Sequence, residues 1–470
     1  MSRPLWTAAE AAQAVGGRLA GGSDWAATGV TIDSRELAPG DLFAALTAER
    51  DGHDFAPDAM ARGAAAALVS REDACEGPRL VVDDVLDALR LLGEFARERA
   101  PALRVGVTGS VGKTSVKEAL AAVFREAGPA HWSVKSFNNH WGVPLTLARM
   151  PAATTRAVFE MGMNHAGEIE GLTAQVRPHI ALITKIAPAH LENLGSMEAI
   201  ADAKAEIFSG LAEDGVAVIP ADDEFAARLS AAAAQAGAAF LIDFGRSADA
   251  AVRVLDHRVV GAGARARIDV VGKVVEVAFE TTGEHHAVNA AGVLAAAFAA
   301  GVEPAFAADI LSKQPAVAGR GAAFEIALDD GGRAVVIDDS YNANPASMEA
   351  AIAALGRRTP KASGRRLAVL GEMLELGPDA EAMHRALSGP LEGAGAAHVI
   401  GVGGLMRTMV DSLPAQCGAR YATDPEKALD MLTASLRDGD VVLVKGSNAS
   451  GVHKIAAALR ETASTARTEA

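Results

Sequence analysis

The spacing of hydrophobic and polar positions divides the chain into three successive blocks. In residues 1–103, a strand-like VTIDSREL (30–37), a short apolar LFAAL, a helical stretch at 55–62 and the strand AAAALVS precede an amphipathic stretch at 85–99. Short apolar runs predict strands, and an apolar period near 3.6 predicts a helix. We therefore expect a small N-terminal α/β substrate domain.

The second block, residues 104–320, alternates short apolar runs with long helical patterns. RVGVT precedes the helical KTSVKEALAAVFREAGP, and further strands are predicted at 156–160, 179–186 and 215–220. This alternation indicates a parallel sheet with helical crossovers. Residues 251–281 alternate in polarity and break at glycines, which predicts antiparallel hairpins. The expected central domain is a mostly parallel sheet of the P-loop type.

The third block, residues 321–470, is a second α/β series. Strands predicted at 333–338, 365–371, 397–403 and 440–447 alternate with helices. Polar residues cluster where these strands end, which is the usual ligand edge of an open parallel sheet. The predicted fold class is α/β in three domains, the last of them Rossmann-like.

Composition and charge narrow the class of protein. Half of the 470 residues are hydrophobic and 22% are charged, which excludes an intrinsically disordered chain. The net charge of −15 argues against a nucleic-acid partner or an anionic membrane surface. Cys75 and Cys417 have no metal-ligand spacing, and no apolar run reaches the ~18 residues of a membrane span. We expect a cytoplasmic protein with reduced cysteines.

The strongest local motif is TGSVGKTS, between an apolar strand and a helix. A strict GxxxxGK[ST] pattern would place glycine where Val107 stands. Gly109 and Gly112 still allow backbone N–H groups to face an anion, and Lys113 adds a positive charge. The alternative is an ordinary strand-to-helix turn. We predict a phosphate-binding loop made of Thr108, Gly109, Ser110, Val111, Gly112, Lys113, Thr114 and Ser115.

Three more polar residues follow the next segments of this block. Glu160 ends a predicted strand and offers the hard oxygen that Mg²⁺ prefers. His190 lies in the loop after the following strand, and Lys204 lies near the start of a helix, where burial would leave a reactive amine. Each also has an ordinary interpretation, respectively a solvated carboxylate, a structural histidine and a solvated helix face.

Together these motifs resemble the Mur ligase family, the ATP-dependent amide-forming enzymes of peptidoglycan synthesis. The TGSVGKT loop, the EMG strand end, the AHLE loop and the AK-x-E helix stand in that family's order, and the match spans nearly the whole chain. The dipeptide-adding branch is favoured by IDSRELAPGDLFAAL, DGHDF, NNHWGVPLTL, MGMNHAGEI, IAPAHLENLGS, IDDSYNANPASM, LGEMLELG and VKGS. The resemblance implies a monomer that joins D-Ala-D-Ala to UDP-MurNAc-tripeptide through an acyl phosphate.

The resemblance also implies the cofactors, ATP and two Mg²⁺ ions, and the residues that hold them. Lys113 would bind the terminal phosphates. Thr114 and Glu160 would hold one Mg²⁺, and His190 with a carbamylated Lys204 would hold the second. The remaining nucleotide contacts would come from Asn289 at the adenine, Arg320 at the γ-phosphate, and Asp339 and Asn342 on the loop of the last domain.

Substrate-binding residues follow in the same way. Ser34 and Arg35 match the uridine-nucleotide turn, Asn138 and Asn139 begin a loop that would face the muramyl peptide, and Tyr341 and Asn344 would lie near the incoming amine. The chain departs from the family pattern in two places. His286 stands where asparagine is commoner, and KGSN replaces KGS followed by arginine, although Lys445 and Ser447 remain candidates for contacts on domain closure.

Other functions remain open at this point. A diaminopimelate- or lysine-adding ligase would carry a DNPR-like motif, which we do not find, and a folylpolyglutamate synthase is a further relative. A P-loop ATPase or binding module would hydrolyse nucleotide without an amine-dependent product. A purely structural protein would leave the polar strand ends unexplained. The third residue of the acceptor peptide, diaminopimelate or lysine, also stays open.

Overall fold

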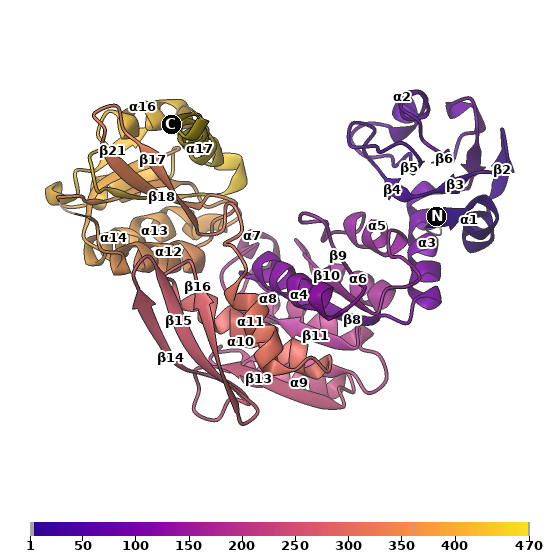
Figure 1. The fold of residues 1–470 in the computed structure, drawn as a ribbon, viewed down its shortest axis with the longest axis horizontal. Helices are drawn as coiled ribbons and strands as arrows, with labels where there is room; N and C mark the ends of the chain where they lie inside the picture. Colours follow the sequence, from indigo (N-terminus) through magenta and orange to yellow (C-terminus); the bar gives the residue numbers. More distant parts are fainter. Residues whose placement is uncertain (1–3, 362, 469–470) are drawn as a thin grey trace.

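The computed structural model describes residues 4–361 and 363–468, and it has the predicted three-domain α/β fold. The N-terminal and C-terminal units stand at opposite ends of the molecule, and the central unit joins them (Figure 1). Within the described residues, no helix is long and apolar enough to cross a membrane.

The N-terminal unit contains a mixed sheet covered by helices. Its strands lie in the order β2 (Arg18–Ala20), β7 (Arg79–Val81), β6 (Ala66–Val69), β5 (Asp41–Ala44) and β4 (Gly29–Thr31), with only β2 antiparallel to its neighbour; β1 (Trp6–Thr7) pairs separately with β3 (Ala26–Ala27). The helices are α1 (Ala8–Val15), α2 (Ala56–Ala61) and α3 (Val85–Arg99). Asp84 caps α3 by accepting a hydrogen bond from the Asp87 amide over 2.8 Å.

The predicted strand at 30–37 is wrong beyond its first residues, because the strand ends at Thr31. The Asp33 carboxylate accepts the Arg35 amide over 2.9 Å, and the Glu36 amide bonds to the Asp33 carbonyl. An aspartate that binds the backbone two residues later favours a turn over a strand.

The central unit is built on a large mixed sheet. Its strands lie in the order β16 (Lys273–Phe279), β15 (Gly263–Val270), β14 (Val252–Val260), β13 (Phe240–Gly245), β12 (Val216–Pro220), β11 (Ile180–Ile183), β8 (Leu103–Thr108), β10 (Arg156–Glu160) and β9 (Ala130–Trp132). The pairings from β9 to β14 are parallel, and β14 to β16 form the predicted antiparallel hairpins.

Helices cover both faces of this sheet, so its middle strands are apolar on both sides. They are α4 (Lys113–Ala127), α5 (Gly142–Ala148), α6 (Glu168–Val176), α7 (Leu191–Leu194), α8 (Met197–Ala205), α9 (Ala226–Gln235), α10 (Glu284–Ala299) and α11 (Pro304–Ser312). One apolar core contains Val105, Leu120 and Leu294, and the core on the opposite face contains Phe159, Ile183 and Phe208.

The C-terminal unit is a parallel sheet with one antiparallel edge strand. The order is β17 (Ala322–Ala327), β18 (Arg333–Asp339), β22 (Val441–Lys445), β19 (Arg366–Gly371), β20 (Ala396–Val402) and β21 (Arg420–Ala422), of which β17 is the antiparallel one. Its helices are α12 (Pro345–Arg357), α13 (Ala380–Ala386), α14 (Ser388–Gly393), α15 (Met406–Ser412), α16 (Pro425–Thr433) and α17 (His453–Thr468).

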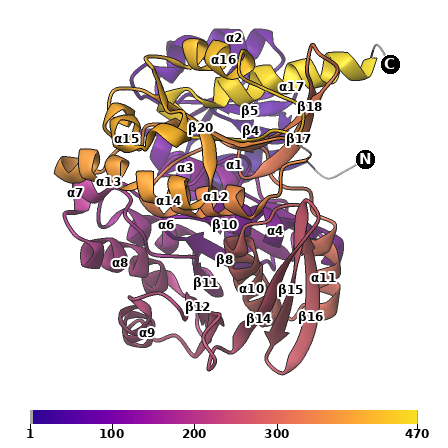
Figure 2. The same ribbon diagram turned by 90° about the vertical axis from the view of Figure 1, so that its left-hand side faces the viewer.

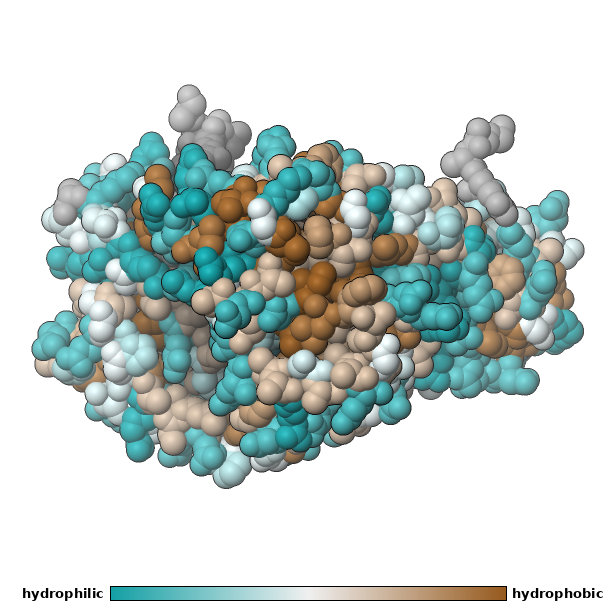
Figure 3. All heavy atoms as spheres, turned by 90° about the horizontal axis from the view of Figure 1, so that it is seen from below, coloured by the Kyte–Doolittle hydropathy of each residue, from teal (hydrophilic) through white to brown (hydrophobic). Residues whose placement is uncertain are grey.

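The central and C-terminal units touch along one side. In Figure 2, α13 lies directly above α7, and the ion pair between His190 and Glu375 joins the loops beside these helices. Seen from below, hydrophobic residues gather in the middle of the face, between hydrophilic residues on either side (Figure 3).

The sheet order of the central unit creates a place for a ligand. Strand β8 lies between β10 and β11, so the chain leaves β8 toward one side and returns on the other. Such a switch point opens a crevice at the carboxyl ends of the strands.

Candidate functional site

The loop after β8 has the backbone geometry of an anion-binding turn. Gly109 has φ 143° and Gly112 has φ 86°, conformations that residues with a side chain rarely adopt. A Cβ on Gly109 would collide with the Thr184 hydroxyl, and one on Gly112 would lie 2.9 Å from the Asn289 amide oxygen. Helix α4 begins at Lys113, so its N-terminal dipole faces the loop.

Residues after the neighbouring strand β11 hold this loop rigid. The Ser110 amide donates to the Lys185 carbonyl over 2.7 Å, and the Ala187 amide donates to the Ser110 hydroxyl over 3.0 Å. The Thr184 hydroxyl donates to the Val111 carbonyl over 2.5 Å. Thr184 and Lys185 were not predicted from the sequence, although their place at the end of a strand beside β8 was a usable signal.

A polar chain links the first turn of α4 to strand β10. The Thr114 hydroxyl donates to Glu160 Oε2 over 2.8 Å, and Asn138 Nδ2 donates to Glu160 Oε1 over 2.8 Å. Arg320 Nη2 in turn donates to the Thr114 hydroxyl over 2.8 Å. Glu160 is 1% exposed, so its carboxylate is a fixed oxygen donor rather than a solvated one.

This donor set fits Mg²⁺. The ion prefers a few oxygen ligands from protein and completes its shell with water and phosphate oxygens. Among the described residues, no group of three or more His, Cys, Asp or Glu side chains could hold a metal by itself. A site made of one hydroxyl, one carboxylate and the oxygens of a nucleotide does not require such a group.

Burial is the main cause that lowers the pKa values of Lys113, Lys204 and His190. The pKa of Lys113 is lowered by burial and by the charge of Arg320, while Glu160 opposes that effect. Burial, helped by the charge of Lys113, lowers the pKa of Lys204 well below its usual value. Burial likewise lowers the pKa of His190, and Glu375 opposes it. The expected shift of Lys204 toward a neutral amine therefore has a structural basis.

The predicted position of Lys204 within its helix is wrong. Helix α8 begins at Met197, where Ser196 caps it by accepting the Ala199 amide over 3.1 Å, so Lys204 stands in the last turn. Its side chain is 2% exposed, and it is not among the residues that line the cavity described next.

A cavity of about 560 Å³ brings together residues from the central strands, the linker and the C-terminal unit. The predicted site residues on its lining are Ser110, Val111, Gly112, Lys113, Thr114, Ser115, Asn138, Glu160, His190, Asn289, Arg320, Asp339, Tyr341, Asn342 and Asn344. Its lining also includes His285, His286 and Lys445, and the unpredicted Ser136 and Lys185. An adjoining cavity of about 110 Å³ shares Ser115, His286, Asn289 and Arg320.

The C-terminal side of the cavity is built on two adjacent strand ends. Asp339 of β18 is in register with Lys445 of β22, and Lys445 Nζ lies 2.9 Å from Asp339 Oδ2. Burial raises the pKa of Asp339, and the charge of Lys445 opposes this. Lys445 also donates to the Asn342 carbonyl over 3.0 Å, which holds the loop that carries Tyr341.

Other predicted site residues have structural contacts. The Asn139 side chain accepts the Gly142 amide over 2.9 Å at the start of α5, and the Asn344 side chain accepts the Ser347 amide over 2.9 Å as the cap of α12. Thr108 is fully buried, and its hydroxyl has no hydrogen-bond partner among the described residues. Ser447 is buried after β22.

The pair Ser34 and Arg35 lies in the N-terminal unit, on the turn after β4. Arg35 Nη2 pairs with Asp33 Oδ2 over 2.6 Å while its side chain stays 76% exposed. The guanidinium is therefore accessible to a ligand, and the hydrogen bonds that it donates to Asp33 lower the pKa of that carboxyl to about 2.

Family models and a relative of known function match most of this chain. Three family models match it: "Mur ligase family, catalytic domain" over residues 26–103, "Mur ligase middle domain" over 107–297 and "Mur ligase, glutamate ligase domain" over 319–448. UDP-N-acetylmuramoyl-tripeptide–D-alanyl-D-alanine ligase of Escherichia coli (strain K12) is 35% identical over 94% of this chain and 95% of its own length.

Solved structures of MurF enzymes are similar to this chain over nearly its whole length. MurF from Acinetobacter baumannii matches with a TM-score of 0.84 and 29% identity, covering 97% of this chain and 99% of that one. MurF ligase from Thermotoga maritima in complex with ADP matches with a TM-score of 0.76 and 25% identity, covering 93% and 98%.

Proposed function

The chain belongs to the Mur ligase family, and we propose on that premise that it joins D-alanyl-D-alanine to UDP-N-acetylmuramoyl-tripeptide, a step of peptidoglycan synthesis, with ATP as the energy source. The observation that carries the proposal is that one cavity is lined both by Lys113, Glu160 and Arg320 and by Asp339 and Lys445 of the C-terminal unit. These groups could bind a triphosphate on one side and a second substrate on the other.

The three units have separate roles in this proposal, with divisions at 1–103, 104–320 and 321–470. The N-terminal unit holds the UDP part through Ser34 and the exposed Arg35. The central unit binds ATP, and the C-terminal unit brings the incoming amine. The role of Asn138 and Asn139 toward the muramyl peptide remains a prediction, because the contacts of both side chains stay within the central unit.

In the nucleotide site, the loop Thr108–Ser115 turns its backbone N–H groups toward the phosphates. Thr108 contributes only through its backbone, because its side chain is buried. Lys113 contacts the terminal phosphates after it leaves the Gly109 carbonyl, to which it donates over 2.7 Å. Asn289, which packs against Gly112, faces the adenine, and Asp339 and Asn342 contact the ribose or phosphates from the C-terminal side.

Thr114 and Glu160 are the residues that would hold the first Mg²⁺, and His190 with Lys204 would hold the second. Bound there, the ions would neutralise phosphate oxygens. A lysine must be neutral to accept CO₂, and burial lowers the pKa of Lys204 toward that state. Carbamylation would turn this amine into an oxygen donor, which a hard divalent ion requires.

The chemistry needs no covalent enzyme nucleophile. The terminal carboxylate of the tripeptide attacks the γ-phosphate of ATP, giving an acyl phosphate and ADP. The amine of D-Ala-D-Ala then attacks the acyl carbon and expels phosphate. Arg320 stabilises charge on the transferred group, and Tyr341 and Asn344 lie where the amine would enter. Closure of the C-terminal unit over the central unit would exclude water, which otherwise hydrolyses the acyl phosphate.

The test is mass spectrometry of the product formed from UDP-MurNAc-tripeptide, ATP, Mg²⁺ and D-Ala-D-Ala, with phosphate release measured in parallel. A product heavier by the dipeptide less one water, formed only with the amine, is the expected result. Phosphate release that is equal with and without D-Ala-D-Ala, and gives no new peptide, would mean a P-loop ATPase instead.

A further inference from the structure

Lys117 is a buried lysine that the proposed reaction does not use. It stands on α4 one turn after Lys113 and is 0% exposed. Its ammonium donates to the carbonyls of Ser133 and Lys135, each over 2.8 Å, and to Glu118 Oε1 over 2.5 Å. A buried charge is costly unless it is fully hydrogen-bonded. Lys117 therefore holds the segment 133–138, which we name the bridging segment.

Both ends of the bridging segment contact Glu160. The Ser133 hydroxyl accepts the Glu160 amide over 3.3 Å, and Asn138 Nδ2 donates to Glu160 Oε1 over 2.8 Å. The Gly162 amide donates to the Asn138 carbonyl over 2.7 Å. Both the backbone and the carboxylate of the proposed magnesium ligand are thus attached to this segment.

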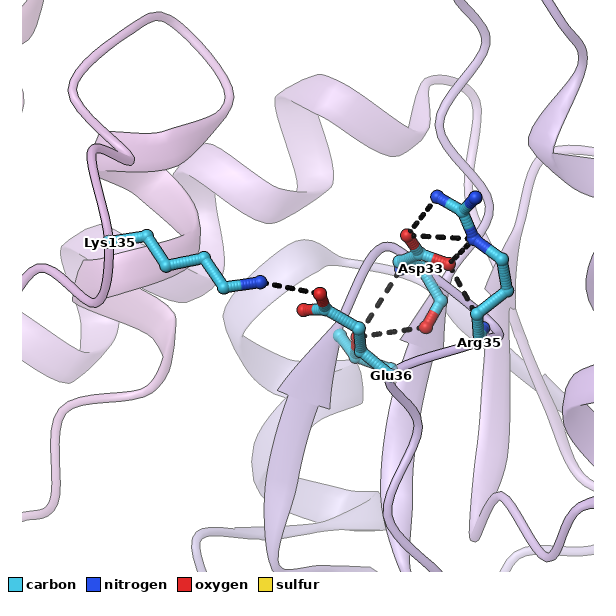
Figure 4. Close-up of polar contacts among 5 residues, drawn as sticks. Asp33, Arg35, Glu36 and Lys135 are labelled. Carbon is cyan, nitrogen blue, oxygen red and sulfur yellow. Dashed lines mark hydrogen bonds and ion pairs between the residues drawn. The ribbon is translucent and has the colours of Figure 1, made fainter. Parts of the chain in front are cut away.

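The middle of the bridging segment reaches the N-terminal unit. Lys135 has φ 54°, a left-handed conformation that is unfavourable for a residue with a side chain, and the bond from Lys117 to its carbonyl helps to stabilise it. In this conformation, Lys135 Nζ lies 2.5 Å from Glu36 Oε1 (Figure 4). Glu36 directly follows Arg35 on the turn that we assign to the uridine nucleotide.

The C-terminal unit touches the same segment. The Tyr341 hydroxyl donates to the Ser136 hydroxyl over 2.5 Å, and the guanidinium of Arg320 lies over the Tyr341 ring at 4.2 Å from its centroid. This short segment of the central unit therefore contacts both flanking units and Glu160.

We propose that the bridging segment couples ligand binding at the uridine-nucleotide turn to the position of Glu160. Lys117, Lys135 and Asn138 act as positioning residues in this coupling. This inference rests on the proposed function of both sites. Ligand bound at the turn of Asp33 and Glu36 would fix Lys135, and Lys117 makes the segment stiff enough to hold Asn138 against Glu160. Two ligands that order the same element bind with positive coupling, without any direct contact between them.

The test measures coupling between the two sites in the full-length protein. The dissociation constant of Mn²⁺ for the enzyme–ADP complex is measured by electron paramagnetic resonance, with and without UDP-MurNAc-tripeptide. In the unaltered protein, the substrate should tighten Mn²⁺ binding. Lys135→Ala and Glu36→Gln should reduce this coupling by about two- to five-fold, the range expected for one exposed ion pair, and leave Mn²⁺ binding without substrate unchanged.

A matched control is available in the same unit. Lys273 and Glu303 form an ion pair of the same length, 2.5 Å, with side chains 60% and 48% exposed, against 61% and 53% for Lys135 and Glu36. Lys273→Ala should leave the coupling intact. The double variant Glu36→Lys with Lys135→Glu should restore the coupling lost in the single variants.

The contact between the bridging segment and Glu160 is tested by its own variant. Asn138→Ala should weaken Mn²⁺ binding about 10-fold or more even without UDP-MurNAc-tripeptide, because the ligand loses the partner that orients it. Lys117→Arg should retain more coupling than Lys117→Met. If Lys117→Met does not fold, Asn138→Ala still tests the link to Glu160.

The outcomes separate this inference from the proposed function. If Lys135→Ala couples the two sites as strongly as the unaltered protein, or if the unaltered protein shows no coupling, the inference is wrong while ligase activity can stand. If the unaltered protein does not bind Mn²⁺ with ADP, the assignment of the nucleotide site itself fails.

Discussion

The guanidinium of Arg320 donates a hydrogen bond to the hydroxyl of Thr114 over 2.8 Å, although the two residues are 206 positions apart. Arg320 belongs to the linker between α11 and β17, and Thr114 belongs to the first turn of α4. The linker to the C-terminal unit is thus hydrogen-bonded to a residue of the proposed magnesium site. The contacts of Arg320 will therefore depend on the relative position of the central and C-terminal units.

Arg320→Lys should lower kcat about 100-fold, while the KM for UDP-MurNAc-tripeptide changes little. Lysine keeps the charge but lacks the planar fork, so it cannot contact Thr114, Tyr341 and a phosphate in one geometry. Steady-state kinetics with each substrate varied in turn measure this. Arg333→Lys, at a residue 71% exposed, is the control, and wild-type kcat in the Arg320 variant would contradict the assignment.

Lys113→Ala should abolish ATP-dependent ligation, a loss of about 1,000-fold or more, because the terminal phosphates lose their point charge. Binding of UDP-MurNAc-tripeptide should persist, since Ser34 and Arg35 lie in a different unit. Calorimetric titration of this substrate, beside the product assay, measures both effects. Near-normal ligation in this variant would refute the phosphate-binding loop.

Lys204→Ala should cause a severe loss of activity, about 100-fold or more, with partial rescue by short-chain carboxylates such as formate or acetate. An added carboxylate can supply the oxygen donor that the carbamate would provide. Lys313→Ala, at a surface lysine that is 68% exposed and treated with the same salts, is the control for non-specific anion effects. Full activity without added carboxylate would show that no carbamate is needed.

His131 should make the protein less stable in acid. Its Nε2 donates to the Thr146 carbonyl over 2.7 Å, and burial, reinforced by Arg149, lowers its pKa from 6.5 to about 4. Between these values the unfolded chain binds a proton that the folded chain does not, so the free energy of unfolding falls as the pH drops. The free energy of unfolding falls by roughly 3 kcal/mol in total, and this decrease is complete below pH 4.

The variant His131→Gln tests that prediction, because glutamine can donate the same hydrogen bond and does not titrate. Urea unfolding followed by tryptophan fluorescence at pH 7, 5.5 and 4.5 should show a stability difference that shifts in favour of the variant as the pH falls. A difference that is constant across this range would exclude His131 as the cause.

The sequence predicted the local elements well where a single signal dominates. RAVFE forms β10 with the predicted ends, and the helix after the phosphate-binding loop ends at Gly128 as expected, because glycine and proline interrupt the periodic pattern there. It failed at residues 32–37, where the hydrogen bonds of Asp33 favour a turn over the continuation of the strand. It also could not show that Asn139, whose side chain binds the first amide of α5, and Asn344, which caps α12, are held by local hydrogen bonds.

What the chain determines by itself is local: which segments form strands, where glycine allows a tight turn, and which charged residues follow a strand end. These depend on neighbours within a few positions. Only the tertiary structure decided that β8 lies between β10 and β11, and so that Thr114, Glu160 and Arg320 meet. It also decided that Lys117 is buried under a segment that touches all three units. Such contacts depend on how sheets and domains pack against each other. No local pattern in the sequence predicts that packing.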